Sequence, residues 1–291
     1  MVLFGAAPMA EAAFLALESG TDALTIDATK LTWACPLDLA GIVATAHWAA
    51  GCAMPVTLKM PADGPTASHL QRMDVLRLMP PRTQIAGRVQ LDAQFEHQPR
   101  RLEVTPLNPA NASDVAERLG HLITASYAEH SISAGRVLFR ACGELITNAV
   151  EHGVGKPGAF LAAQAHVGSP SERPRLEFAV CDTGIGILQH LRQNPRLAYL
   201  HRDEIAISKA MEAGVSGVGD DRGNGLSDLI EHTRVHGEID FQIRSGQGEV
   251  RVKGSPAAHS EEPRHRPDQT SGTWAWLSHT LLQQPSIKSS Q

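Results

Sequence analysis

The segment from residue 175 to residue 187 constrains the fold more than any other part of the chain. RLEFAVCD, residues 175–182, is largely apolar and typical of a buried strand, and Asp182 at its end is followed by Gly184 and Gly186. This order places one carboxylate beside a loop whose backbone can take conformations that other residues avoid. A ligand can therefore approach that backbone closely, although the pattern alone is equally compatible with a tight turn.

A helix with one polar stripe precedes this strand. Apolar residues recur at helical spacing from about residue 135 to residue 152, and Glu144, Asn148 and His152 follow one another at intervals of four. A carboxylate, a carboxamide and an imidazole along one face can meet a divalent cation and phosphate groups. The alternative interpretation is the solvated face of an amphipathic helix.

A glycine-rich turn at residues 221–229 opens a further predicted helix, 225–237. Backbone N–H groups at such a turn favour an anion. The turn lacks the Lys-Ser/Thr pair of a P-loop, and no strand directly precedes it as a dinucleotide fingerprint requires. Residues 188–222 contain no long apolar run, so we expect a polar, glycine-rich segment there. Strands are predicted at 159–167, 238–246, 249–254 and 273–281, with a flexible loop at 259–269.

The N-terminal part of the chain alternates strand and helix patterns. Strands are predicted at 23–31 and 54–61, and helices at 38–51 and 66–79. Residues 80–112 are rich in Pro, Arg, Gln and Asn, so the connector between two domains is placed there, with a helix at 114–129 after it. The predicted domains are residues 1–100 and 101–285.

Composition excludes several classes of function. The net charge of −5 gives no sign of a basic surface for nucleic acid, and the aromatic content of 4% is too low for stacking along a single strand. The four cysteines form no C-x-x-C pair, which argues against a zinc site and favours buried free thiols in a reducing compartment. The N-terminus lacks the basic region of a signal peptide, and Asp38 and His47 interrupt the best membrane-spanning candidate. We therefore expect a cytoplasmic protein that binds neither nucleic acid nor membrane.

The order of the motifs resembles that of the GHKL ATPases, the superfamily of histidine kinases, DNA gyrase and anti-sigma-factor serine kinases. ELITNAVEHG is similar to the N box, CDTGIGI to the first glycine box, RGNGL to the second, and SGTWAWL to the terminal Gly-Thr strand. The resemblance covers residues 111–280. It implies a C-terminal α/β sandwich with a mixed sheet that binds ATP and Mg²⁺.

The resemblance also implies roles for individual residues. Glu144 would be the catalytic carboxylate, which polarises the attacking group or holds metal through water, and Asn148 would bind Mg²⁺. Asp182 would accept a hydrogen bond from the adenine amine, His152 would lie near phosphate, and residues 188–222 would form a lid. The remaining nucleotide-binding positions are Gly184, Gly186, Gly223, Asn224, Gly225, Leu226 and Thr273.

The N-terminal part resembles a STAS domain, the fold of anti-sigma-factor antagonists, over residues 25–62. Such domains carry a phosphorylatable serine where the loop meets the helix, and here that junction reads Ala34-Cys35-Pro36. We therefore expect a regulatory docking or pseudo-substrate element that is not phosphorylated at the junction. No phosphoacceptor hairpin precedes the N box.

Together the two resemblances predict an ATP-dependent kinase that phosphorylates a serine or threonine of a protein partner, an anti-sigma antagonist or sigma-factor-like regulator, in a partner-switching pathway. The resemblance is compatible with a homodimer. Two alternatives stay open: a non-catalytic module that binds its partner under nucleotide control, and a histidine kinase whose phosphoacceptor lies on another protein.

Overall fold

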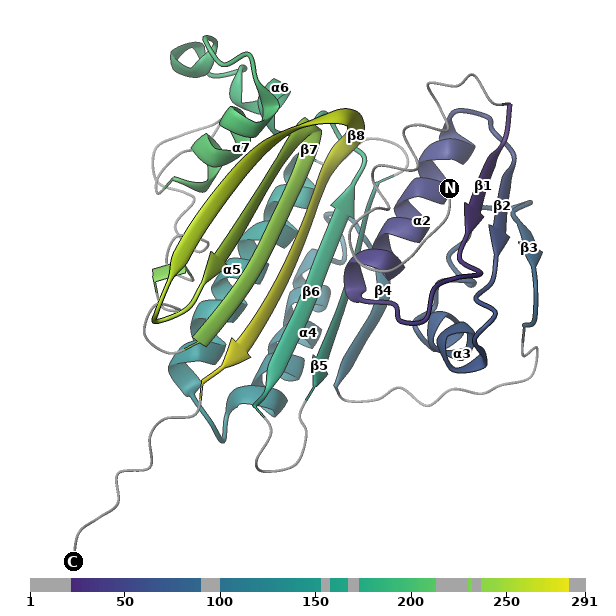
Figure 1. The fold of residues 1–291 in the computed structure, drawn as a ribbon, viewed down its shortest axis with the longest axis horizontal. Helices are drawn as coiled ribbons and strands as arrows, with labels where there is room; N and C mark the ends of the chain where they lie inside the picture. The colour runs from purple at the N-terminus through teal and green to yellow at the C-terminus, as the bar shows by residue number, and fades with distance from the viewer. Residues whose placement is uncertain are drawn as a thin grey trace, which may run out of the picture.

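The computed structural model describes residues 22–89, 100–152, 158–166, 173–212, 230–231 and 237–282. Their strands form two sheets, one of three strands near the N-terminus and one of five strands in the rest of the chain (Figure 1). The chain is therefore of mixed α/β class, as the sequence predicts.

The three-stranded sheet is parallel and has the order β1-β2-β3. Its elements confirm the predicted strand–helix–strand–helix order, with α3 ending before the predicted residue 79 because turns follow Met73. The elements are β1 (Leu24–Asp27), α2 (Pro36–Gly51), β2 (Val56–Lys59), α3 (Gly64–Arg72) and β3 (Gln84–Ala86).

Helix α2 is buried along most of its length. It starts at Pro36, a first-turn position where the missing N–H costs no helical hydrogen bond. The Asp38 carboxylate accepts a hydrogen bond from the backbone N–H of Cys35 at 2.9 Å, which ties down the start of the helix. Residues 36–46 and Ala49 are all buried, so α2 must be covered on more than one side.

The five-stranded sheet has the order β4-β5-β6-β8-β7, and every described pairing in it is antiparallel. The predicted mixed sheet is therefore wrong for this part of the chain. Short connections such as residues 255–258, between β7 and β8, allow only antiparallel neighbours. The strands are β4 (Arg101–Leu107), β5 (Ala159–His166), β6 (Arg175–Asp182), β7 (Gly237–Gly254) and β8 (His259–Leu281).

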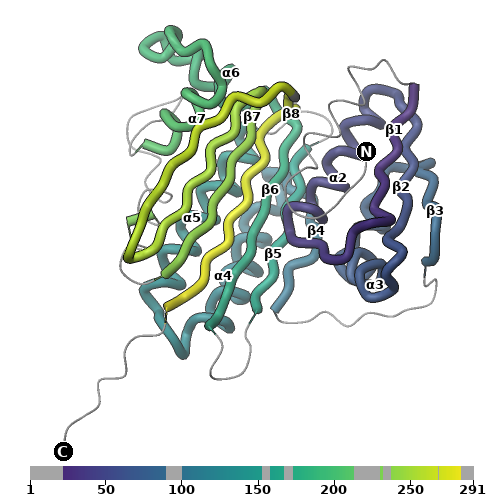
Figure 2. The backbone as a smooth tube through the Cα atoms, viewed as in Figure 1, coloured from purple at the N-terminus to yellow at the C-terminus, as the bar shows by residue number. Residues whose placement is uncertain are grey.

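The two faces of this sheet, whose strands Figure 2 traces as a backbone tube, belong to different hydrophobic cores. Leu161, Val180 and Ala275 form a cross-strand row that packs with α4 (Ala112–Tyr127) and α5 (Ile132–His152). The neighbouring row, Phe160, Cys181 and Trp274, packs with α2 on the opposite face. The five-stranded sheet therefore lies between the α4–α5 helical layer and the N-terminal unit, here defined as residues 22–89.

Three segments differ from the sequence predictions. β4 lies within the predicted connector and pairs with β5. Residues 187–211, predicted only as part of a polar, glycine-rich segment, contain α6 (Ile187–Leu191), a short 3-10 helix and α7 (Asp203–Met211), which share a small apolar core. The predicted loop 259–269 is strand: it belongs to β8 and pairs with β7. Of the helix predicted at 225–237, only residues 230–231 are described, and they are helical.

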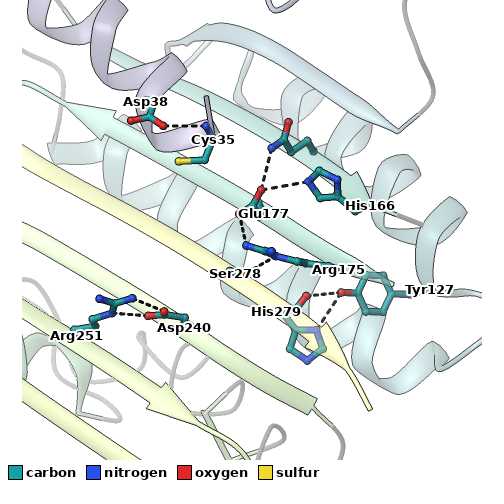
Figure 3. Close-up of polar contacts among 11 residues, drawn as sticks. Cys35, Asp38, Tyr127, His166, Arg175, Glu177, Asp240, Arg251, Ser278 and His279 are labelled. Atoms are coloured by element: carbon teal, nitrogen blue, oxygen red, sulfur yellow. Dashed lines mark hydrogen bonds and ion pairs between the residues drawn. The ribbon is translucent and has the colours of Figure 1, made fainter. Parts of the chain in front are cut away.

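Strands β7 and β8 form a long hairpin that changes register between Ser245 and Gly248. An ion pair joins the two halves of β7, with Arg251 Nε donating to Asp240 Oδ1 at 2.7 Å (Figure 3). This contact between residues eleven positions apart shows that β7 turns back on itself at the irregularity. Across the described ranges, no helix combines the length and the apolar character needed to cross a membrane.

Candidate functional site

The candidate site is built around the carboxylate at the end of β6. Asp182 Oδ1 accepts hydrogen bonds from the backbone N–H of Gly184 at 2.8 Å and of Thr273 at 3.1 Å. Both bonds go to the same oxygen, so Oδ2 has no hydrogen bond to a described residue. The structure thereby brings together three of the predicted site residues: Asp182, Gly184 in the loop after β6, and Thr273 in β8.

Burial dominates the electrostatics of Asp182. The side chain is 6% exposed, and burial raises the pKa of its carboxyl group to about 7, although the two backbone N–H groups act in the opposite direction. The group can therefore take or release a proton near neutral pH. A carboxylate held in this way can accept a hydrogen bond from a polar ligand that replaces the lost water.

Two glycines give the backbone around Asp182 its shape. Gly272 has φ +74°, and a Cβ on it would lie 2.2 Å from the carbonyl oxygen of Asp182. Gly186 has φ +79°, and a Cβ there would lie 2.8 Å from Ser245 Oγ. Both positions require glycine, because a side chain is strained at these positive φ angles and its Cβ would collide with a neighbouring atom. The sequence predicts Gly186 as a site residue and Gly272 as the glycine of the terminal Gly-Thr strand, but it gives no signal for Ser245.

Ser245 fastens the loop to the hairpin. Its Oγ accepts a hydrogen bond from the N–H of Ile187 at 2.9 Å and donates one to the carbonyl of Gly272 at 3.0 Å. The first bond holds the start of α6, and the second holds the turn that precedes Thr273. No local sequence signal identifies this serine, because its partners are 58 and 27 residues away.

Helix α5 supplies the polar stripe predicted from the sequence. Glu144 is half-buried and takes part in a polar interaction, Asn148 is exposed, and His152 is half-buried at the last position of the helix. The ring of His152 lies against that of His190 in α6, with centroids 3.8 Å apart. Burial lowers the pKa of both imidazoles, and the positive charge of His152 lowers that of His190 further. Sequence reasoning missed His190, although it lies in the segment directly after the glycine loop.

The contact between the two histidines brings the end of α5 to the segment that follows Asp182. The side chain of Asp182 also lies on the α5 side of the sheet, because it has the same strand parity as Val180 in that core. The predicted positions Gly223, Asn224, Gly225 and Leu226 lie outside the described residues.

The residues present fit a magnesium ion with few protein ligands. Mg²⁺ prefers oxygen donors and is commonly held by one or two side chains plus substrate phosphates. Asn148 offers an exposed carboxamide oxygen, and Glu144 lies one turn before it. Over the described ranges, no group of three or more His, Cys, Asp or Glu side chains could form a complete protein cage for a metal.

No protein-family model matches this chain, and neither a curated protein nor a solved structure is detectably similar to it.

Proposed function

We propose that the chain binds Mg-ATP at the site between α5 and the loop after β6. The observation that carries the proposal is the arrangement at Asp182, a buried carboxylate with one oxygen held by Gly184 and Thr273 and the other without a described hydrogen-bond partner. An adenine amine is a donor that such an oxygen can accept, and the glycine-shaped backbone allows close approach of a base. The resemblance to GHKL ATPases supports the same assignment.

The other residues have distinct proposed tasks. Asn148 would hold Mg²⁺, which neutralises phosphate charge when bound. His152 would lie near the phosphates, and Glu144 would accept the proton of a serine or threonine hydroxyl of the partner protein. Phosphoryl transfer needs little more than positioning, charge neutralisation and a proton acceptor, so these few side chains are a sufficient set.

The position of the N-terminal unit bears on its proposed regulatory role. Ala34 and Cys35 are buried, and α2 packs on the face of the sheet opposite α5. This packing supports a docking and regulatory role exerted from the face of the sheet opposite the candidate site. We propose that the unit acts through the shared sheet. Its buried junction, which has no hydroxyl, supports the absence of phosphorylation there.

Calorimetry with four proteins tests the nucleotide site. Asp182→Asn should weaken ATP binding by about tenfold or more, because it loses a charged acceptor, while GTP binding changes little. Asn148→Ala should make the affinity for ATP the same with Mg²⁺ and with EDTA. Thr147→Ala, an exposed neighbour on the same helix, is the matched control and should bind as the wild type does.

Unchanged Mg-ATP affinity in both site variants would show that the site is misassigned. If the affinities change as expected, radiolabelled ATP separates the kinase from the binding module. Label transfer to a serine or threonine of a partner supports the kinase, and tight binding without transfer supports the module.

A further inference from the structure

Two imidazole rings are in contact beside the glycine loop of the candidate site. The ring centroids of His152, the last residue of α5, and His190, in α6, are 3.8 Å apart, and the ring planes are tilted by 32°. The backbone N–H of His190 donates to the carbonyl oxygen of Gly186 at 3.1 Å, so this residue lies one helical turn after the loop. The two rings, here called the histidine pair, therefore join the two elements between which the nucleotide is proposed to bind.

The ring nitrogens of the histidine pair have unused hydrogen-bonding capacity. Both side chains are half-buried, and that of His152 is 31% exposed. No hydrogen bond joins either imidazole to another described residue. Glu151 Oε2 lies 3.9 Å from His152 Nε2, which is too far for a hydrogen bond. The nitrogens are thus available to a ligand that accepts hydrogen bonds, such as an oxyanion.

The surroundings keep the histidine pair mostly uncharged above pH 7. Burial lowers the pKa of both imidazoles, and a proton on His152 lowers the pKa of His190 further, because the two charges would lie in contact. Glu151 acts in the opposite direction on both rings. Within the described ranges, no other charged group acts on either pKa, whether from α4 and β6 packed on α5 or from α7 and β7 packed on α6. A negative charge brought to the rings by a ligand would therefore favour protonation of both.

We propose that His152 and His190 act together as an anion-binding pair, which receives a phosphate group of the ligand and takes up a proton from solvent as that group binds. The proposal rests on the proposed nucleotide site and adds to it a second histidine and a dependence on pH. A protonated imidazole donates from both of its nitrogens, so the added proton increases the number of hydrogen bonds to phosphate oxygens. The proton moves from solvent to a ring nitrogen, and no covalent bond of the ligand changes.

This proton uptake predicts that phosphate-bearing ligands bind more tightly as the pH falls from 8 to 6. The affinity increases by up to about tenfold for each unit by which the ligand raises the pKa of the pair. Asp182 has the opposite effect on ATP, because its carboxyl group, with a pKa of about 7, must lose its proton to act as a charged acceptor for the adenine amine. A polyphosphate without adenine therefore reports the linkage of the histidine pair alone.

Histidine NMR of the full chain tests the proposal directly. The chain has 14 histidines, so the ring Cε1–H signals of the pair are assigned with His152→Gln and His190→Phe. The two pKa values are measured between pH 5 and pH 8 in the free chain, with tripolyphosphate and with Mg-ATP. We expect both to lie below the ordinary value of 6.5 in the free chain, and at least one to rise by about one unit with either ligand.

A matched pair of variants assigns the effect to the two rings. His190→Phe keeps an aromatic ring beside His152 and removes one titratable group, whereas His121→Phe makes the same change on the exposed surface of α4. Calorimetry gives the affinity for tripolyphosphate at pH 6 and pH 8. The affinity should increase about fivefold or more at the lower pH in the wild type and in His121→Phe, and about twofold or less in His190→Phe. Protonation of the ligand itself is common to all three proteins and cancels in this comparison.

The outcomes separate this proposal from the nucleotide site. Ligand binding that leaves both histidine pKa values unchanged would overturn the proposal, as would the same pH dependence in the wild type and in His190→Phe. If Mg-ATP binds in either case, the nucleotide site stands. If tripolyphosphate raises a pKa as expected but Mg-ATP does not bind, only the nucleotide site is wrong. If neither ligand binds, both proposals are wrong.

Discussion

The carboxyl group of Asp182 is buried against the backbone of its own loop. This burial lowers the stability of the folded chain by an amount that depends on pH. Because the pKa is raised from 3.8 to about 7, the folded chain binds this proton more tightly than the unfolded chain does. Stability from this group is therefore greatest below pH 4 and falls as the pH rises to 7. Above pH 7 the folded protein carries the full cost of a buried negative charge.

Asp182→Asn should remove this cost while keeping an oxygen that can accept both backbone N–H groups. We expect the variant to melt about 5 °C above the wild type at pH 8 and close to it at pH 4.5, where the wild-type carboxyl group is mostly neutral. Thermal denaturation followed by circular dichroism at the two pH values measures the difference. An equal difference at both values would show that charge burial is not its cause.

The sequence predicts the residues of the site where the signal is local and misses them where it is not. Asp182, Gly184 and Gly186 lie within five consecutive positions, so one pattern reveals them, and the structure places the first two in direct contact. Ser245 and His190 come to the site through the packing of distant segments. Only knowledge of how the hairpin and α6 pack could have identified these two.

At the level of elements, local composition explains why some strands are predicted from the sequence and others are missed. β6 is buried on both faces and has the bounds predicted from its apolar run. The first part of β8 reads HSEEPRHR, and residues 259–265 are all exposed, so neither face gives an apolar alternation. Pro263 also favours the prediction of a loop. A proline is nevertheless tolerated in a strand with one unpaired edge.

Hydrogen exchange should distinguish a strand from a loop at residues 259–265. Amides of this segment that bond to β7 should exchange at least about tenfold more slowly than those of an unstructured peptide of the same sequence. Mass spectrometry of overlapping peptides, or NMR for single amides, provides the measurement. Exchange at the rate of the free peptide along the whole segment would support the loop predicted from the sequence.

At the level of the whole molecule, the main unpredicted feature is the packing of α2 on the five-stranded sheet. The apolar content of α2 predicts a buried helix, and nothing in its sequence specifies the second surface that buries it. Phe160, Ala162, Trp274 and Trp276 supply that surface from strands more than a hundred residues later. The N-terminal unit and the sheet therefore contribute to one core.

This shared core predicts how a truncated chain behaves. A fragment of residues 100–291 would expose the aromatic and aliphatic side chains that α2 covers, so we expect it to bind a hydrophobic dye and to self-associate, unlike the full chain. Adding residues 1–99 as a separate fragment should reduce both effects. Dye fluorescence and light scattering measure them. A monomeric, dye-free fragment of residues 100–291 would show that the sheet does not need the N-terminal unit.

The alternation of residues along β6 has a consequence for how this chain can change in length. Odd-numbered and even-numbered positions serve different cores, so inserting a single residue early in β6 would turn Cys181 and Asp182 to each other's sides. The carboxylate would then face α2 instead of α5. The turn at residues 256–258 and the β8 segment 259–265 are exposed, so the end of the β7–β8 hairpin can grow or shrink by paired residues without moving the site. Variation in length among descendants of this chain should therefore gather at the hairpin and be absent from β6.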